Sequence, residues 1–349
     1  MNRQAEPIPD VPSTLRYVTD DEPGITRRRC GRGFTYRLPD GQTLRDPAAR
    51  GRIDALAIPP AYEGVWVCVR PEGHLQATGR DAAGRKQYRY HPEYRRYRQQ
   101  KKFDELIGFA EALGSLRRRV HGDLKLPGLP RPRVLAAAVR LMDLTLIRPG
   151  HGGESRGAPT FGLATLHARH LSDEGDTLRL DFRGKGGQRQ RRAIDAPAVA
   201  RVLRRCQGLP GRELLRYLDE DDAPRSIDAG EVNDYLAEHA GPGVTSKVFR
   251  TWGGTVRAAC ELADVERAQR APARDRQVVA AVKRTAAALG NRPATCRAYY
   301  IHPAVIDAFG AGTLAGYFKD VTRLRRRPAK TRLSAVEEAV LALLSNASA

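Results

Sequence analysis

Residues 289–303 read LGNRPATCRAYYIHP and place two adjacent tyrosines on a short helix whose start and end are both marked. Upstream, apolar residues recur at three- and four-residue spacing from Val278 onward, which indicates one face of a helix. Gly290 stands where that helix would have its C-terminal cap. Pro293 can open a new helix at its first position, and Pro303 prevents it from running on. The tyrosine pair therefore lies near the end of about two helical turns.

The charge of the chain indicates its partner. Its 349 residues include 60 lysines and arginines against 40 acidic residues, which leaves a formal net charge of +20. This excess favours a polyanion over an acidic small molecule, and nucleic acid is the first candidate. Hydrophobic residues at 41% suit a globular chain that is long enough for two domains with cores of their own.

Cysteine usage and hydropathy indicate the compartment. The five cysteines are scattered without a close pair or a histidine pair at zinc-ligand spacing, so we expect reduced thiols and no metal site. No stretch approaches the length of a transmembrane helix, and the N-terminus lacks the apolar core of a signal peptide. We therefore expect a cytoplasmic, nucleoid-associated protein that does not bind membranes.

Other segments of the chain add polar side chains that suit phosphoryl transfer. They are Ile147-Arg148-Pro149-Gly150, Arg183-Gly184-Lys185-Gly186-Gly187 and Phe249-Arg250-Thr251-Trp252-Gly253-Gly254-Thr255. In chain order the chain thus presents Arg148, Lys185, Arg250, Asn291 and Tyr300, and the tyrosine stands nine positions after the asparagine. This ordered set resembles the active site of type IB DNA topoisomerases, specifically the small bacterial, poxvirus-like enzymes.

The N-terminal part carries a second resemblance. Residues 58–62 (IPPAY), 73–81 (GHLQATGRD) and 84–92 (GRKQYRYHP) closely match the N-terminal domain of the bacterial type IB enzymes. In that family this domain closes over the duplex, and the segment that begins at Gly84 would face the DNA. Basic and aromatic side chains suit phosphate, sugar and base-edge contacts. The candidates for DNA contact here are Arg80, Arg85, Lys86, Tyr88 and Tyr90.

Together the patterns and the resemblance predict an α+β protein. Signals for short strands and turns fill residues 26–91, and helical periodicity begins near residue 93. We expect a small N-terminal antiparallel β-sheet domain over residues 1–94 that clamps DNA. A larger, mainly α-helical catalytic domain of the type IB topoisomerase/tyrosine recombinase fold should follow over residues 95–349. Residues 1–22 are polar and rich in proline and acid, so we expect a loose arm there.

Local signals predict how the catalytic residues are presented. A helix over 135–147 should end at Arg148, because Pro149 and Gly150 stop it. Alternating apolar residues over 178–182 predict a half-buried strand, and the glycines around Lys185 predict a hairpin tip. Thr245 or Ser246 should cap the helix that carries Arg250, and Ser334-Ala335-Val336-Glu337 has the pattern of a capping box that opens a C-terminal helix.

The resemblance also implies roles for these side chains. Tyr300 would attack phosphorus and form a 3′-phosphotyrosyl link. Arg148 and Arg250 would hold the non-bridging oxygens, and Asn291 would donate a further hydrogen bond to one of them. Lys185 would protonate the leaving 5′-oxygen. The implied function is relaxation of supercoiled double-stranded DNA by transient single-strand cleavage, swivelling and religation, by a monomer, without ATP, metal or other cofactor.

The sequence departs from the family pattern in places that keep alternatives open. Pro149, His151 and Glu154 replace residues common in relatives, and Asn291 stands where viral enzymes and many recombinases use histidine. Lys247, also a candidate DNA contact, stands where tyrosine recombinases place a histidine. A tyrosine recombinase or integrase, or a catalytically inactive DNA-binding clamp, are the alternative interpretations. A plasmid-relaxation assay distinguishes all three.

Overall fold

The chain divides into two compact units, Met1–Lys102 and Phe103–Ala349. The computed structural model describes residues 10–150, 154–155, 157–175, 177–319, 329 and 331–348. The division lies within helix α2 (Pro92–Asp123), a few residues beyond the boundary predicted near residue 94. Antiparallel strands dominate the first unit and helices the second, so the predicted α+β class is confirmed.

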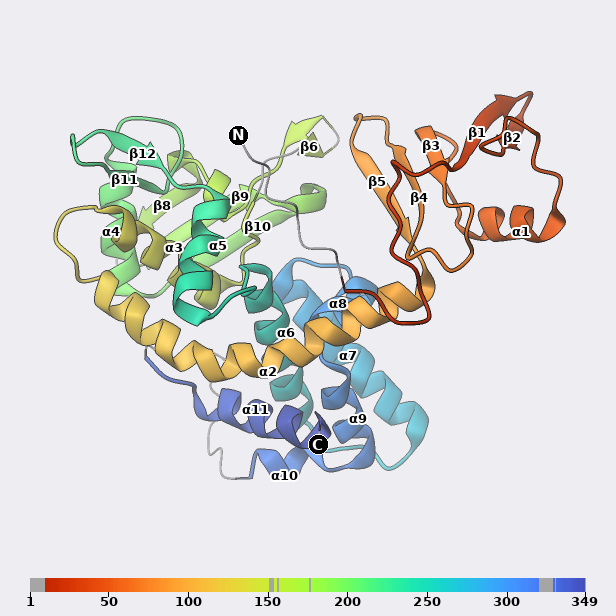
Figure 1. Cartoon of the computed structure of the whole chain (residues 1–349). Coiled ribbons are helices and arrows are strands. Elements are labelled where there is room, and N and C mark those ends of the chain that lie inside the picture. The colour runs from red at the N-terminus through yellow and green to blue at the C-terminus, as the bar shows by residue number, and fades with distance from the viewer. Residues whose placement is uncertain are drawn as a thin grey trace. The chain divides into compact units, whose positions relative to one another are not determined.

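The first unit is built on a five-stranded antiparallel sheet of order β2-β1-β3-β4-β5 (Figure 1). Its elements are β1 (Ile25–Cys30), β2 (Gly33–Arg37), α1 (Pro47–Ala55), β3 (Glu63–Val67), β4 (Leu75–Arg80) and β5 (Lys86–Tyr90). Helix α1 was not predicted. Its start was nevertheless signalled locally, because the Asp46 side chain accepts from the Ala48 and Ala49 N–H groups and Pro47 occupies the first helical position.

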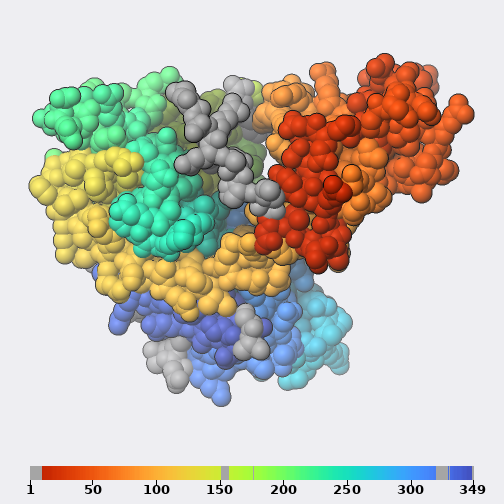
Figure 2. All heavy atoms as spheres, in the orientation of Figure 1, coloured from red at the N-terminus to blue at the C-terminus, as the bar shows by residue number. Residues whose placement is uncertain are grey.

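The segment before β1 is fastened to this sheet. Val18 is 1% exposed, and its N–H donates to Nδ1 of His74 at 3.2 Å. The ring of Tyr17 stacks on the same histidine at 4.8 Å between centroids. Asp20 accepts from the Thr78 hydroxyl at 2.9 Å. In Figure 2 the red atoms of this segment lie directly against orange atoms of the same unit. Leu15 is also buried, and Arg16 N donates to Glu72 O at 2.8 Å, so the expectation of a loose arm is wrong from Leu15 onward.

The second unit surrounds one large hydrophobic core. Its helices are α3 (Arg131–Thr145), α4 (Pro197–Gln207), α5 (Ala229–Ala240), α6 (Lys247–Ala263), α7 (Ala271–Leu289), α8 (Pro293–Tyr300), α9 (Pro303–Ala311), α10 (Leu314–Tyr317) and α11 (Ala335–Ser348), with 3-10 turns η1 (Leu163–Thr165), η2 (Ala168–His170) and η3 (Lys185–Gly187). Its strands are β6 (Glu154–Ser155), β7 (Ala158–Pro159), β8 (Leu171–Glu174), β9 (Thr177–Arg183), β10 (Arg189–Ile194), β11 (Arg216–Leu218) and β12 (Pro224–Ser226).

Strands β8 to β10 form an antiparallel sheet of order β10-β9-β8 (Figure 1). Along β9, Leu178, Leu180 and Phe182 are buried while Arg179 and Arg183 are exposed, so the predicted half-buried strand is confirmed. The β9–β10 hairpin therefore has one face anchored in the core of the unit, and its tip projects from that anchored base.

The end of α3 differs from the prediction. The helix stops at Thr145, because Leu146 adopts a left-handed conformation (φ 55°) while its N–H still bonds Met142 O. Arg148 therefore lies in the stretch after the helix rather than at its end. That stretch pairs with another loop, since Leu163 N donates to Arg148 O at 2.8 Å and Ala164 N to Pro149 O at 2.9 Å.

The caps of α6 and α11 are only partly as predicted. Ser246 occupies the N-cap of α6, but its side chain makes no cap hydrogen bond there. At α11 the Glu337 carboxylate reaches back to Ser334 N at 2.8 Å, which is one half of a capping box. The other half is absent in this helix, because Glu337 N donates to the Ser334 carbonyl rather than to its hydroxyl.

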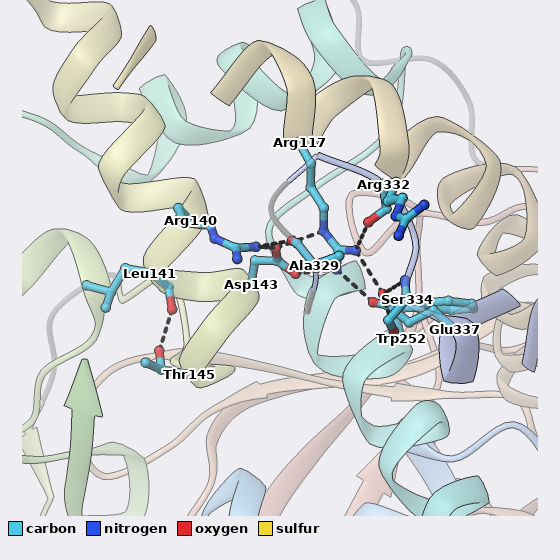
Figure 3. A network of polar contacts seen from close by, with 10 residues as sticks. All are labelled: Arg117, Arg140, Leu141, Asp143, Thr145, Trp252, Ala329, Arg332, Ser334 and Glu337. Carbon is cyan, nitrogen blue, oxygen red and sulfur yellow. Dashed lines mark hydrogen bonds and ion pairs between the residues drawn. The ribbon is translucent and has the colours of Figure 1, made fainter. Parts of the chain in front are cut away.

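A buried network of charges joins four helices of this unit (Figure 3). Arg117 of α2, 2% exposed, donates to both oxygens of Asp143 on α3 and of Glu337 on α11, at 2.7 to 3.0 Å. Trp252 Nε1 of α6 also donates to Glu337, at 3.2 Å. Burial alone would raise the pKa of Glu337, yet hydrogen bonds and charge from Arg117 hold it below its usual range. The network fixes α3 and α6 relative to each other.

No helix in the described part of the chain combines the length and apolar character needed to cross a bilayer.

Candidate active site

Arg250 of α6 lies where the ends of two other helices meet. The side chain is 3% exposed. Its Nη1 donates to the carbonyl oxygen of Leu146, just past α3, and its Nη2 donates to that of Leu289, the last residue of α7, at 2.9 Å. Carbonyl groups at helix C-termini lack intrahelical partners and carry partial negative charge. The guanidinium therefore satisfies both ends at once and joins three segments that are far apart in the sequence.

Asn291 connects this arginine to Arg148. Its Oδ1 accepts from Arg148 Nη2 and from Arg250 Nη2, the latter at 3.3 Å. Its Nδ2 is buried and has no hydrogen-bond partner among the described residues. Because one amide oxygen orients two cationic groups, the amide N–H donors of the same side chain remain able to bind a ligand.

The two guanidinium groups lack a compensating acid in the described part of the chain. Among residues the structure describes, no carboxylate forms an ion pair with Arg148 or Arg250. Burial lowers the pKa of Arg250, the charge of Arg148 lowers it further, and the Tyr300 side chain opposes both effects. An uncompensated pair of arginines beside a free amide donor is the electrostatic arrangement that favours binding of an oxyanion such as phosphate.

Tyr300, the last residue of α8, packs against this pair. The guanidinium carbon of Arg250 lies 5.1 Å from the centroid of its ring, within the range of a cation–π contact. Tyr299, one position earlier, is 50% exposed. Adjacent helical residues point about 100° apart, so only one of the two can face the arginines. The structure places Tyr300 there.

Two adjacent glycines of α6 allow this close packing. A Cβ atom on Gly253 would lie 2.4 Å from Leu146 Cδ2, and one on Gly254 would lie 2.4 Å from the Tyr300 carbonyl oxygen. A larger residue at Gly254 would push α6 away from the backbone that carries the tyrosine, and one at Gly253 would meet the side chain of Leu146. Sequence reasoning did not identify these glycines as functional, although a glycine pair inside a helical pattern is a readable signal of close approach.

Lys185 lies apart from this group in the described structure. It is exposed on η3 at the tip of the β9–β10 hairpin, as predicted, and the turn is closed by Gly184 N donating to Gln188 O at 2.8 Å. Gly186 and Gly187 both adopt positive φ angles, near 77°. No described residue forms a hydrogen bond or ion pair with the Lys185 side chain.

The loop that carries Arg148 is held against the base of this hairpin. Gly150 (φ 80°) and Gly162 approach so closely that a Cβ on either would lie within 2.6 Å of the other's Cα. Phe161 N donates to Arg183 O, at the end of β9, at 2.8 Å. Of the departures from the family pattern, Pro149 belongs to this paired stretch and Glu154 begins β6, while His151 lies outside the described residues.

The predicted DNA contacts of the first unit gather at the β4–β5 hairpin. Arg80 donates to Gly84 O at 3.0 Å, and the rings of Tyr88 and Tyr90 stack at 5.9 Å. Two of the cations already have acidic partners that the prediction did not consider: Arg85 pairs with Asp81 at 2.9 Å, and Lys86 with Asp20 at 2.6 Å. Surface pairs of this kind are weak, so a phosphate group can replace the carboxylate.

Lys247, the candidate contact in the second unit, is the exposed first residue of α6. It lies less than one helical turn before Arg250.

Comparison with known proteins identifies the family. The family model described as "Eukaryotic DNA topoisomerase I, catalytic core" matches residues 91–324, well over half of the chain. The chain belongs to the type IB DNA topoisomerases. The model "Bacterial DNA topoisomerase IB, N-terminal domain" matches residues 33–81, so the resemblance inferred from sequence motifs is confirmed in both parts of the chain. Membership of the type IB family makes the chain an isomerase whose substrate is DNA.

Two relatives support the assignment. "DNA topoisomerase 1B" of Acanthamoeba polyphaga mimivirus is 28% identical over 237 residues, which cover 67% of this chain and 70% of the viral protein. "DNA topoisomerase 1" of Daucus carota is 28% identical over 128 residues, which cover 36% of this chain but 15% of the plant protein. The match of the catalytic-core model and the similarity to individual relatives thus indicate the same family.

Proposed function

We propose that this topoisomerase relaxes supercoiled duplex DNA by cutting one strand through a 3′-phosphotyrosyl intermediate, letting the strand swivel, and resealing it. The observation that carries the proposal is that Tyr300, Arg250, Arg148 and Asn291 converge in one basic site, where the Asn291 Nδ2 has no partner among the described residues. A nucleophile beside two phosphate-binding cations is what a phosphodiester exchange requires.

In this mechanism Tyr300 attacks phosphorus and the 5′-oxygen of the next nucleotide leaves. Negative charge develops on the two non-bridging oxygens, and Arg148 and Arg250 neutralise it while the Asn291 amide donates to one of them. Because Arg250 is already locked between two helix ends, little reorganisation is needed when that charge appears.

Lys185 is the proposed general acid for the leaving 5′-oxygen. Its position on a glycine-rich hairpin tip supports the assignment, since the side chain is exposed and the tip can approach a DNA strand bound at the arginine site. Proton transfer to the leaving alkoxide contributes about two to four decades in typical enzymes. The resealing step then uses the same groups in reverse.

The covalent link conserves the energy of the phosphodiester bond, so we propose that religation needs no ATP. The arginine pair supplies the positive charge that the transition state requires, so we propose that no metal is obligatory. The free 5′ end can rotate about the intact strand, which relaxes supercoils of either sign.

We further propose that the first unit is a DNA-clamping domain and that the enzyme acts as a monomer on the nucleoid. The exposed aromatic and basic side chains at the β4–β5 hairpin support the DNA contact, as does exposed Lys247 at the start of α6, the helix that carries Arg250. Phosphate contacts by such residues release condensed counterions, so binding should weaken steeply as salt is raised.

The test is relaxation of a supercoiled plasmid in excess chelator without nucleotide. We expect the linking number to change in steps under these conditions, with activity falling steeply as salt increases. An absolute requirement for magnesium or ATP would exclude the proposed mechanism. Products that depend on two matched DNA sites would indicate a recombinase, and binding without any change in linking number would indicate an inactive clamp.

A further inference from the structure

A second arginine bridges the same two helix ends as Arg250. Arg192 of β10 donates from Nε to the carbonyl oxygen of Thr145 at 3.3 Å and from Nη2 to that of Ala288 at 2.9 Å. Arg250 binds the carbonyl groups one residue further along in both helices. The two guanidinium groups therefore bridge the end of α3 and the end of α7 at successive residues.

These two helix ends lead directly into the site. Arg148 follows α3, and Asn291 follows α7 after the left-handed Gly290. The side chains of Arg148 and Asn291 meet only if both ends keep their separation and their register. Arg250 makes one contact with each end, and the second pair of contacts from Arg192 limits how far the two ends can turn relative to each other.

Arg192 also fastens the hairpin that carries Lys185. It lies on the returning strand, and its Nη2 additionally donates to Gln190 Oε1 at 2.7 Å. Gln190 in turn lies against Gly290, where a Cβ would come within 2.3 Å of Gln190 Nε2. Burial lowers the pKa of Arg192. The acceptors described above are neutral carbonyl and amide oxygens, which do not raise the pKa as a carboxylate would.

We propose that Arg192 is a positioning residue of the cleavage reaction, which holds the ends of α3 and α7 so that Arg148, Asn291 and Arg250 converge on one phosphate. This inference rests on the proposed function. The opposing interpretation, a direct phosphate contact, is disfavoured because Arg192 is half-buried and makes four hydrogen bonds to protein acceptors.

Arg191 provides the matched control. It precedes Arg192 on the same strand, is exposed, and pairs with Asp181 at 3.0 Å. Removing its charge therefore changes the net charge of the hairpin as much as removing that of Arg192, without touching either helix end.

The experiment compares Arg192→Gln, Arg192→Lys and Arg191→Gln with the wild type. Enzyme in excess is mixed with a duplex that contains one mapped cleavage site, and the covalent adduct is trapped with detergent over time. A misplacement of about 1 Å in a reacting group costs about 100-fold in rate. We expect losses of that order for Arg192→Gln and Arg192→Lys, since lysine cannot reach both carbonyl groups. DNA binding by these variants should stay within about threefold, while Arg191→Gln should cleave at the wild-type rate.

A substrate with sulfur in place of the scissile 5′-oxygen separates the possible roles. A thiolate leaves without protonation, so this substrate should restore a Lys185→Ala variant but leave Arg192→Gln slow, because the donors to the non-bridging oxygens remain misplaced. Restoration of both variants to the same degree would mean that Arg192 acts only on the hairpin and would overturn the proposal. Equal losses in binding and cleavage would show a phosphate contact and would also overturn it. A wild type that forms no adduct would instead refute the proposed function itself.

Discussion

Replacing Gly254 by alanine tests how closely α6 approaches the segment that carries Tyr300. A Cβ at this position would lie 2.4 Å from the Tyr300 carbonyl oxygen and 3.1 Å from Leu289 Cδ1. Ordinary van der Waals contact begins near 3.4 Å, so the two backbones would have to separate by about 1 Å (3.4 − 2.4). A carbonyl oxygen cannot rotate away as a side chain can, so α8 or α6 must move.

The expected effects on stability and on catalysis differ in size. Alanine is favoured over glycine inside a helix by about 1 kcal/mol, whereas overpacking costs about 1–3 kcal/mol. The net loss of stability is therefore at most about 2 kcal/mol, which a folded domain tolerates. The displacement of Tyr300 by about 1 Å should instead reduce the rate of covalent adduct formation by about 100-fold.

Two measurements on the same variant check this prediction: urea unfolding, and single-turnover adduct formation with saturating enzyme. Gly108→Ala is the control, because Gly108 is exposed on α2 and a Cβ there meets no atom within 4 Å. The control should gain up to about 1 kcal/mol and cleave at the wild-type rate. If Gly254→Ala also cleaved at the wild-type rate, the inference that the close contact at Gly254 positions Tyr300 would be refuted.

Three further predictions concern single side chains. Tyr300→Phe should abolish the adduct trapped by denaturing the DNA-bound enzyme while Tyr299→Phe retains it, and peptide mapping that found the nucleotide on Tyr299 would reverse the assignment. Lys185→Ala should cleave ordinary DNA slowly by about two or more decades and be largely restored by the sulfur-containing substrate, whereas equal slowness on both would remove its role as general acid. Glu337→Gln should lower the free energy of unfolding by about 3 kcal/mol, because among the described residues Arg117 and Arg140 would then share Asp143 alone, which leaves one buried positive charge uncompensated. Glu338→Gln, exposed and one residue later, should change it by less than about 1 kcal/mol, and similar midpoints in urea would contradict the buried network.

Local signals predicted those elements whose ends are determined by neighbouring residues. The glycine cap of α7, the start of α8 at Pro293 and the end of α8 before Pro303 are all confirmed, because a left-handed cap and a proline act within one turn of the chain. The hairpin around Lys185 is confirmed for the same reason.

Predictions failed where distant contacts decide the local conformation. Arg148 was expected at a helix end, yet Leu146 turns left-handed and its carbonyl oxygen binds Arg250, 104 positions away. The N-terminal segment was expected to be loose because it is polar, but its few apolar and aromatic side chains pack on His74 and its neighbours. Neither contact can be predicted from the residues that are adjacent in the sequence.

By itself, the sequence determined the family, the α+β class and the ordered set of candidate residues, because these depend on motif order and on short-range periodicity. Tertiary structure alone decided that Arg148 and Asn291, 143 positions apart, share one hydrogen bond, and that Arg192 repeats the bridge made by Arg250. Such contacts depend on where two helices end in space, and that is set by core packing and by close approaches such as the one at Gly254. The order of residues in the sequence identifies the candidate site residues, but only the packed backbone brings their side chains within hydrogen-bonding distance.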